Sequence, residues 1–343
     1  MDWRTAIALP ICVAMTAYSL LDLVPIVQGG NAGQALANAA DLARHVESLG
    51  FSRYWVAEHH GMEGIASAAT AVVIAHVGAA TATIRVGAGG IMLPNHSPLQ
   101  VAEQFGTLDA LFPGRVDLGL GRAPGSDQRV AAAIRRGLGG EGNDFPQDVI
   151  ELQSYFADDG QTGVRATPGA GAKVDLWILG SSLFGAQLAA ALGLPYAFAS
   201  HFAPGLLEEA IDMYRRNFRP SAVLEKPHLM LGFNVFAADN EEEATYLASS
   251  QQQAFVAIRT TGRGIQLPPP VHGYRENLGP HGNAMLDQVL SASAIGGLDK
   301  VRRELAAFVA HTDADELILT SAMFDHDARK KSLTIAAEAM RAL

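Results

Sequence analysis

The chain contains almost no cysteine, because Cys12 is the single one among 343 residues. One cysteine excludes an internal disulfide framework and a metal site built from several thiolates. This cysteine usage fits a reducing compartment, and we therefore expect the protein in the cytoplasm.

The chain also lacks an excess of basic residues. Asp and Glu number 35 against 25 Lys and Arg, which gives a formal net charge of -10 at pH 7. This charge argues against nucleic acid or an anionic membrane as the main partner. Hydrophobic residues make up 49% of the chain and charged residues 17%, a balance typical of a globular, enzyme-like protein with an ample core.

The N-terminus lacks a hydrophobic run long enough for a membrane span. Ala6–Leu21 is mostly apolar, but Pro10 interrupts it, and a span needs roughly 20 residues. This run could imitate the core of a signal peptide, although the charges of Asp2 and Arg4 nearly cancel. The alternative is an extension that ends before the first strand. We divide the chain into an N-terminal extension, residues 1–17, and one domain, residues 18–343.

Short apolar segments alternate with segments of helical periodicity along that domain. The expected strands cover residues 20–25, 53–57, 84 onward, 116–120, 176–179, 196–199, 229–237 and 317–320. The expected helices cover residues 35–49, 67–80, 101–111, 148–156, 183–192, 206–218, 241–259, 298–311 and 328–343. Eight strands that alternate with helices predict an α/β fold, a single (β/α)8 TIM barrel.

A doubly wound open sheet is the main alternative. It is disfavoured because no G-x-G-x-x-G follows the first expected strand. One connection, Gly262–Asn283, shows neither a helix nor a strand pattern and is too long for an ordinary loop. We expect it to form an extended rim or lid loop on the barrel.

Two successive strands end in glycine within the stretch Ile84–Pro124. The first ends at Gly89 and Gly90, and the second ends at Gly121, directly before Arg122. The carboxyl ends of parallel strands are where α/β folds place their chemistry. Small residues and a cation are therefore expected together at the mouth of the barrel.

A carboxylate and two histidines, Glu58, His59 and His60, follow the second strand. Neighbouring residues on an extended chain face opposite ways, so at most one histidine should face the mouth. That imidazole could shuttle a proton near neutral pH. Alternatively, both histidines bond to backbone and are structural. We expect no metal site, because H-E-x-x-H is absent and no third ligand has an obvious spacing.

The fifth strand runs into Ser181 and Ser182 at the start of a helix, with Gly185 in the first turn. Backbone N–H groups, the positive helix end and two hydroxyls suit a phosphate group, and Arg122 could pair with its oxygens. The alternative is a plain serine N-cap. His201, after the sixth strand, is a candidate for the substrate pocket, with a rim position as the alternative.

Together, these motifs resemble the bacterial luciferase-like flavin-dependent monooxygenases of the single-chain, FMN-using kind. The resemblance covers Tyr18 to about Leu333. Four segments carry it, in order YWVAEHHGMEGIASAA, IRVGAGGIMLPNHSPLQVAEQFGTLDALFPGRVDLGLGRAPGSD, VDLWILGSSLFGAQLAAALGLPYAFASHFAP and ADELILTS.

The resemblance implies a flavin bound at the mouth of the barrel. Gly89-Gly90 matches the family's non-proline cis peptide, which supports the flavin ring. The phosphate-binding positions of the family match Arg122, Ser181, Ser182 and Gly185. His59 matches the histidine implicated in acid–base chemistry, and His60, with His201, is assigned to the substrate pocket.

The implied reaction is that of a monooxygenase that uses reduced FMN and O2 on a small organic substrate. A separate NAD(P)H-dependent flavin reductase would supply the reduced FMN. An F420-dependent oxidoreductase of the same fold and a non-catalytic flavin-binding protein are the alternatives. Relatives of this fold often dimerise, so a homodimer is a further expectation. Gly121 stands where luciferase has a reactive cysteine, and we expect no light-emitting reaction.

Overall fold

The computed structural model describes residues 16–123, 128–134 and 144–343. The expected extension, residues 1–17, therefore lies outside the described residues except for its last two positions. The strands are β1 Ala17–Asp22, β2 Arg53–Val56, β3 Arg85–Met92, β4 Val116–Gly121, β5 Asp175–Gly180, β6 Tyr196–Phe198, β7 Leu229–Ala237, β8 Ser293–Gly296 and β9 Glu316–Thr320.

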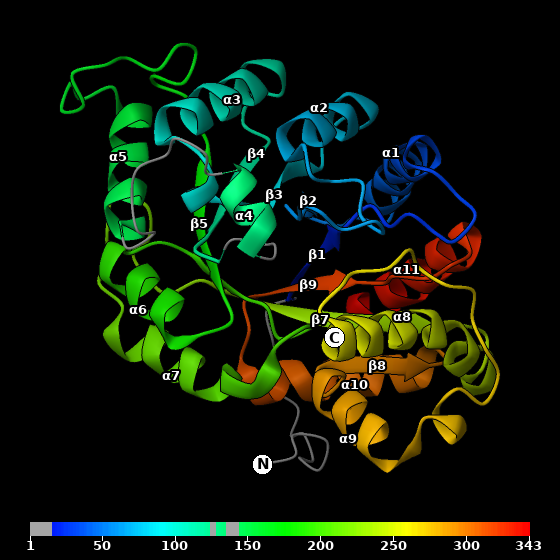
Figure 1. The fold of residues 1–343 in the computed structure, drawn as a ribbon. Helices are drawn as coiled ribbons and strands as arrows, with labels where there is room; N and C mark the ends of the chain where they lie inside the picture. The colour runs from blue at the N-terminus through cyan, green and yellow to red at the C-terminus, as the bar shows by residue number, and fades with distance from the viewer. Residues whose placement is uncertain (1–15, 124–127, 135–143) are drawn as a thin grey trace.

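Eight of these strands close into a barrel, with every pair parallel. Strands β1 to β7 pair in sequence order, and β9 pairs with both β7 and β1 to close the ring. Figure 1 shows the helices arranged around this ring. The predicted (β/α)8 TIM barrel is confirmed.

The helices alternate with the strands and cover the outside of the barrel. They are α1 Ala32–Ser48, α2 Thr70–Ala80, α3 Pro98–Leu111, α4 Gln128–Ile134, α5 Phe145–Ala157, α6 Leu183–Leu192, α7 Leu207–Asn217, α8 Glu241–Thr261, α9 Gly279–Val289, α10 Leu298–Thr312 and α11 His326–Arg341. Short 3₁₀ turns, among them η2 Leu93–Asn95, η3 Pro204–Leu206 and η4 Arg275–Asn277, connect some of them. Asp325 caps α11 by accepting a hydrogen bond from the backbone N–H of Ala328.

One strand escaped the sequence analysis. β8 pairs with the last four residues of β7, from Asn234↔Ser293 to Ala237↔Gly296, and lies outside the closed ring. Its sequence, SAIG, is short and made mostly of small residues, so it carries no strand pattern. The pairing depends on β7 being longer than its barrel neighbours.

The expected rim loop Gly262–Asn283 is present as a long connection, but it is not without secondary structure. It contains η4 and the first turn of α9, where Pro280 stands near the helix start and fits the helix φ. Leu267 exchanges backbone hydrogen bonds with Ile26 and Gln28, each at 2.9 Å. Pro280 thus begins a helix here, and the loop is tied to the segment that follows β1.

Buried charges lie at the amino ends of the barrel strands. Arg53 of β2 donates from Nη1 to both oxygens of Asp117 at 3.0 Å and from Nε to both oxygens of Glu316 at 3.1 Å. Both carboxylates are buried, and Trp55 Nε1 donates to Asp117 at 2.9 Å. Carboxylates in such a place require these partners, because an unpaired buried charge is very costly.

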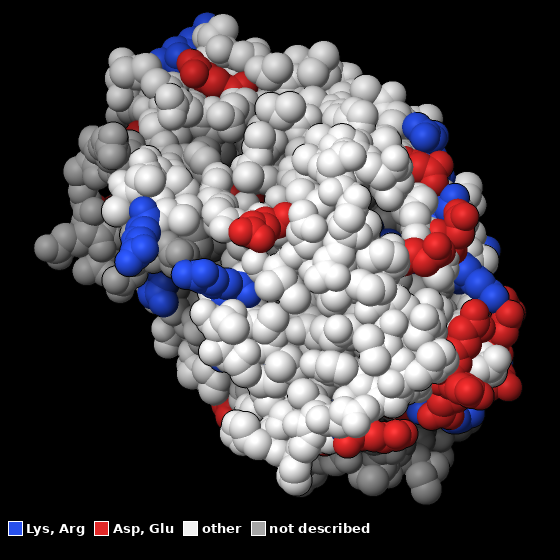
Figure 2. All heavy atoms as spheres, turned by 45° about the vertical axis from the view of Figure 1, so that its right-hand side comes forward, with Lys and Arg blue, Asp and Glu red and all other residues white. Residues whose placement is uncertain are grey.

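The outer surface carries its charges unevenly. On the face shown in Figure 2, charged side chains are sparse across the centre, and Asp and Glu gather along one edge. Lys and Arg are scattered on this face and form no broad basic patch. Among the described residues, every helix is too short or too polar to cross a membrane.

Candidate active site

The carboxyl end of β3 carries an unusual stretch of bare backbone. The Gly89–Gly90 peptide bond is cis. The β3–β4 register shifts between Gly89 and Ile91, so Gly90 lies outside the regular pairing. A Cβ added to Gly90 would lie 2.6 Å from the carbonyl oxygen of Gly119, a distance that Cβ atoms do not tolerate. Only glycine fits at this position, and the Gly89–Gly90 backbone carries no side chain.

The walls beside this backbone surface are apolar and come from several strands. Leu21 and Trp55 pack under Gly89, where an added Cβ would lie 2.8 Å and 2.9 Å from their side chains. Leu23 and Leu179 pack on the same interior cluster and are only partly buried. The interior of the barrel is therefore filled below the glycines, and its apolar surface is exposed at the mouth.

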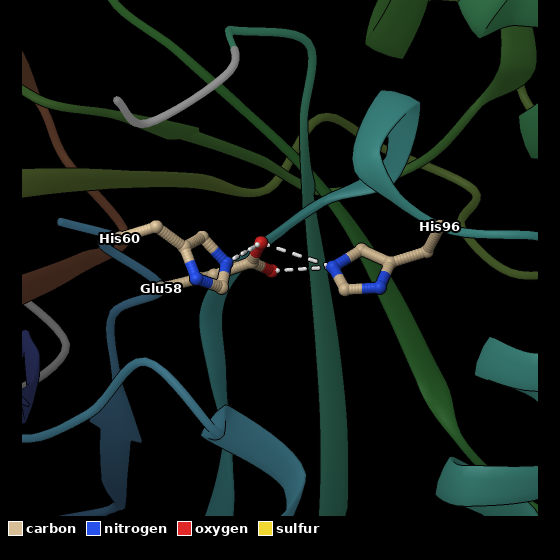
Figure 3. Close-up of side chains that lie close together, drawn as sticks. All are labelled: Glu58, His60 and His96. Atoms are coloured by element: carbon tan, nitrogen blue, oxygen red, sulfur yellow. Dashed lines mark hydrogen bonds and ion pairs between the residues drawn. The ribbon is translucent and has the colours of Figure 1, made fainter. Parts of the chain in front are cut away.

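A buried carboxylate stands next to the glycines. Figure 3 shows Glu58 with its carboxylate between the imidazoles of His60 and His96. The Nε2 atom of His60 lies 2.7 Å from Glu58 Oε1, and that of His96 lies 2.9 Å and 3.0 Å from the two oxygens. Asn95 Nδ2 and the Met92 backbone N–H also donate to the carboxylate, at 3.3 Å and 3.0 Å.

These contacts determine the charge of Glu58. Burial on its own would raise the pKa of the carboxyl, but the hydrogen bonds from His96, Met92 and His60 outweigh it and hold the pKa below its usual value. Glu58 is therefore ionised near neutral pH. The group escaped the sequence analysis because His96 is 38 positions away. The sequence did show that two polar stretches, Glu58–His60 and Asn95–His96, follow the ends of the neighbouring strands β2 and β3.

Glu58, His60 and His96 also have a donor set that metals use, since one ligand atom from each lies within 4.8 Å of the others. The observed contacts do not favour an ion. Both carboxylate oxygens accept imidazole and other N–H donors at hydrogen-bond distance, so the three side chains have a reason to meet without a metal. The expectation of no metal site stays a prediction.

The other two predicted histidines lie near each other. His59 is close enough to His201 for the two imidazoles to interact electrostatically. His201 packs on β7 against Gly232, and its Nδ1 is buried without a hydrogen-bond partner among the described residues. Burial, and secondarily His59, lowers the pKa of His201 to about 4, so this imidazole is neutral at pH 7. His59 and His60 thus belong to different groups.

The low pKa of His201 predicts a specific loss of stability in acid. An unfolded histidine takes up a proton near pH 6.5, whereas His201 stays neutral down to about pH 4. Its contribution is thus fully present above pH 6.5 and is lost as the pH falls toward 4, by about 1.4 kcal/mol per pH unit. Urea unfolding across this range should show that the free energy of unfolding falls less steeply with decreasing pH in His201→Gln than in the wild-type protein. An unchanged slope would contradict the shifted pKa.

The start of α6 and the end of β4 meet at the mouth of the barrel. Ser182 holds the N-cap position of α6, but its side chain makes no capping hydrogen bond. The guanidinium of Arg122 lies 4.1 Å from the ring centroid of Phe184, in the first turn of the same helix. Gly185 packs against the Cα of Gly180, and a Cβ there would lie 3.3 Å from Tyr196. The structure brings Arg122, Ser181, Ser182 and Gly185 to one helix end.

Known proteins share this sequence and this fold. The family profile described as luciferase-like monooxygenase matches residues 18–316. A protein named luciferase-like monooxygenase from Escherichia coli (strain K12) is 53% identical over 321 residues, which cover 93% of this chain and 96% of the relative.

Solved structures agree with this match. The crystal structure of apo-MsnO8 has a TM-score of 0.89 at 34% identity and covers 96% of this chain and 99% of its own. Two more distant structures share the fold at a TM-score of 0.70. One is the oxygenating constituent of 3,6-diketocamphane monooxygenase from Pseudomonas putida in complex with FMN, at 17% identity, 95% of this chain and 97% of its own. The other is an F420-dependent secondary alcohol dehydrogenase, at 16% identity, 96% of this chain and 100% of its own. The chain belongs to the luciferase-like monooxygenase family.

Proposed function

We propose that the protein is a monooxygenase that uses reduced FMN and O2 to oxidise a small organic substrate. The observation that carries this proposal is the pairing of the bare cis Gly89–Gly90 backbone with the Arg122 and α6 helix end at one mouth. A planar ring needs a flat surface without side chains, and a phosphate needs N–H donors and a cation. Both fit FMN, and a separate NAD(P)H-dependent reductase would supply it in the reduced form.

The residues at the mouth have separate proposed roles in binding FMN. Arg122, Ser181 and Ser182 would hold the phosphate, and Gly185 belongs to the same proposed site because it lets the first turn of α6 pack closely on β5. The Gly89–Gly90 backbone would carry the ring. When bound, reduced FMN supplies the electrons that activate dioxygen. The partly buried apolar side chains of Leu23 and Leu179 would help to exclude water from that reaction.

His59 is the proposed catalytic residue. It is the third residue after β2, next to Glu58 in the chain, and it lies close to the neutral His201. An imidazole can give or take a proton at neutral pH, so His59 would act as general acid or base at the reacting atoms. We assign His201 and His60 to the substrate pocket. A cytoplasmic location and a homodimer belong to the same proposal.

The role of Arg122 predicts a selective loss of affinity. Arg122→Met should weaken the binding of FMN about 10–100-fold, because a charge-assisted contact to phosphate is lost, and should leave the binding of riboflavin unchanged. Fluorescence titration with both flavins measures the two effects. Arg259→Met, at an arginine stacked on Phe202 at 5.0 Å, serves as a control. Equal losses for FMN and riboflavin would remove Arg122 from the phosphate site.

One feature of the same region favours F420 as an alternative to FMN. A cavity of about 310 Å³ opens beside Ser181 and is lined by Phe202, Leu206, Arg259 and Gln288, among others. FMN ends at its phosphate, whereas F420 continues beyond it with an acidic tail that Arg259 could pair with. An F420-dependent oxidoreductase is therefore the alternative.

Anaerobic titration with reduced FMN and reduced F420 separates these proposals. Tighter binding of FMN, insensitive to Arg259→Met, supports the monooxygenase. Tighter binding of F420, weakened by Arg259→Met, would support the F420-dependent oxidoreductase in place of the monooxygenase. Tight FMN binding without oxygen consumption above that of free flavin would instead indicate a non-catalytic flavin-binding protein.

A further inference from the structure

The Glu58–His60–His96 group is tied to the glycine surface on both sides of Ile91. The backbone N–H of Glu58 donates to the Gly90 carbonyl at 3.3 Å, and the Met92 N–H donates to Glu58 Oε2 at 3.0 Å. The register shift removes Gly90 from the regular pairing with β4, and Glu58 gives the Gly90 carbonyl a hydrogen-bond partner. A charge on this group therefore lies next to whatever rests on Gly89 and Gly90.

The net charge of the group depends on one proton. Glu58 is ionised and buried, and each imidazole donates to its carboxylate from Nε2. Each ring keeps its Nδ1 for a second proton. The side chains of His60 and His96 are 20% and 26% exposed, so water can deliver that proton.

An anion beside this group changes its affinity for protons. Two negative charges in a site of low dielectric repel each other, and an imidazolium beside one of them relieves the repulsion. We propose that Glu58, His60 and His96 together take up one proton from solvent when an anionic flavin ring binds on Gly89–Gly90. The proton forms an N–H bond at Nδ1 of His60 or His96, and the Nε2–H bonds to Glu58 are kept. This inference rests on the proposed function.

Other titratable groups lie nearby and must be separated from this one. His59 stands between Glu58 and His60 in the chain, and His201 of the β6 end interacts with His59. α5 packs against η2, and its Asp148 interacts with Asp144 and Glu151. On the phosphate side lie Arg122 and, beside Ser181, Arg259.

Anaerobic calorimetry of the full chain tests this proposal. Reduced FMN and oxidised FMN are titrated at pH 7.5 in buffers of different ionisation enthalpy, which counts the protons taken up per ligand bound. The phosphate is common to both ligands and cancels. Reduced FMN, whose ring is anionic, should take up about one proton more than oxidised FMN, whose ring is neutral. The difference should fall to about zero in Glu58→Gln and in the His60→Gln/His96→Gln double variant.

Three results would overturn the proposal. Equal proton counts for the two flavins would show that the group does not respond to the ring. A difference that persists in the double variant would assign the proton to another group, such as His59. Absence of binding by both flavins would overturn the proposed function, and this inference with it. If Glu58→Gln does not fold, the double variant decides the question.

Discussion

Replacing His59 with alanine should lower substrate-coupled oxidation by about 10²–10⁴-fold, the usual contribution of a positioned general acid or base. The affinity for FMN should stay within severalfold, because the ring and phosphate contacts come from Gly89–Gly90, Arg122 and α6. The measurement is product formed per reduced FMN consumed, for a substrate that the wild-type protein converts. Peroxide release should rise in proportion, since oxygen activation without transfer wastes the reduced flavin.

A matched control for His59 lies on the outside of the barrel. His76, on α2, is exposed, and its Nε2 lies 3.2 Å from the Leu36 carbonyl oxygen. His76→Ala should leave both coupling and affinity unchanged. Coupled oxidation that survives in His59→Ala would remove this histidine from the mechanism, whereas a joint loss of FMN affinity would make its role structural.

Replacing Arg53 with methionine should lower the free energy of unfolding by about 3–5 kcal/mol, because the buried carboxylates of Asp117 and Glu316 would lose the cation that they share, and Arg85 remains beside Asp117 alone. Methionine keeps most of the volume, so the effect is that of charge. Urea unfolding measures it.

An exposed ion pair provides the comparison for Arg53. Arg216 pairs with Asp212 at 2.8 Å, with side chains 77% and 63% exposed, and Arg216→Met should cost less than about 1 kcal/mol. A loss for Arg53→Met as small as that for Arg216→Met would contradict the view that these charges depend on Arg53 for their burial.

The fold could be predicted because its signals are local. Each barrel strand is a short apolar segment, and each helix has its own periodicity and end signals. β8 and the start of α9 could not be predicted in this way. β8 exists because the end of β7 offers a free edge, and Pro280 at the start of α9 is equally typical of a loop.

The candidate site was predictable in part for the same reason. Glycines at a strand end and serines before a helix are visible in the sequence, and so is a histidine after β2. The hydrogen bonds of His96 to Glu58 and the stacking of Arg122 on Phe184 are contacts between separate segments. Only the closed barrel, which brings successive strand ends side by side, determines them. The same holds for His201, whose low pKa depends on burial against Gly232.

The central claim is that the mouth of the barrel binds reduced FMN and controls its reaction with dioxygen. The most direct test mixes the anaerobic complex of protein and reduced FMN with oxygenated buffer and follows the return of the oxidised-flavin absorbance. We predict that this return is slower than that of free reduced FMN by about tenfold or more, because the apolar mouth excludes water. A return at the rate of free reduced FMN, at protein concentrations that saturate binding, would contradict the claim.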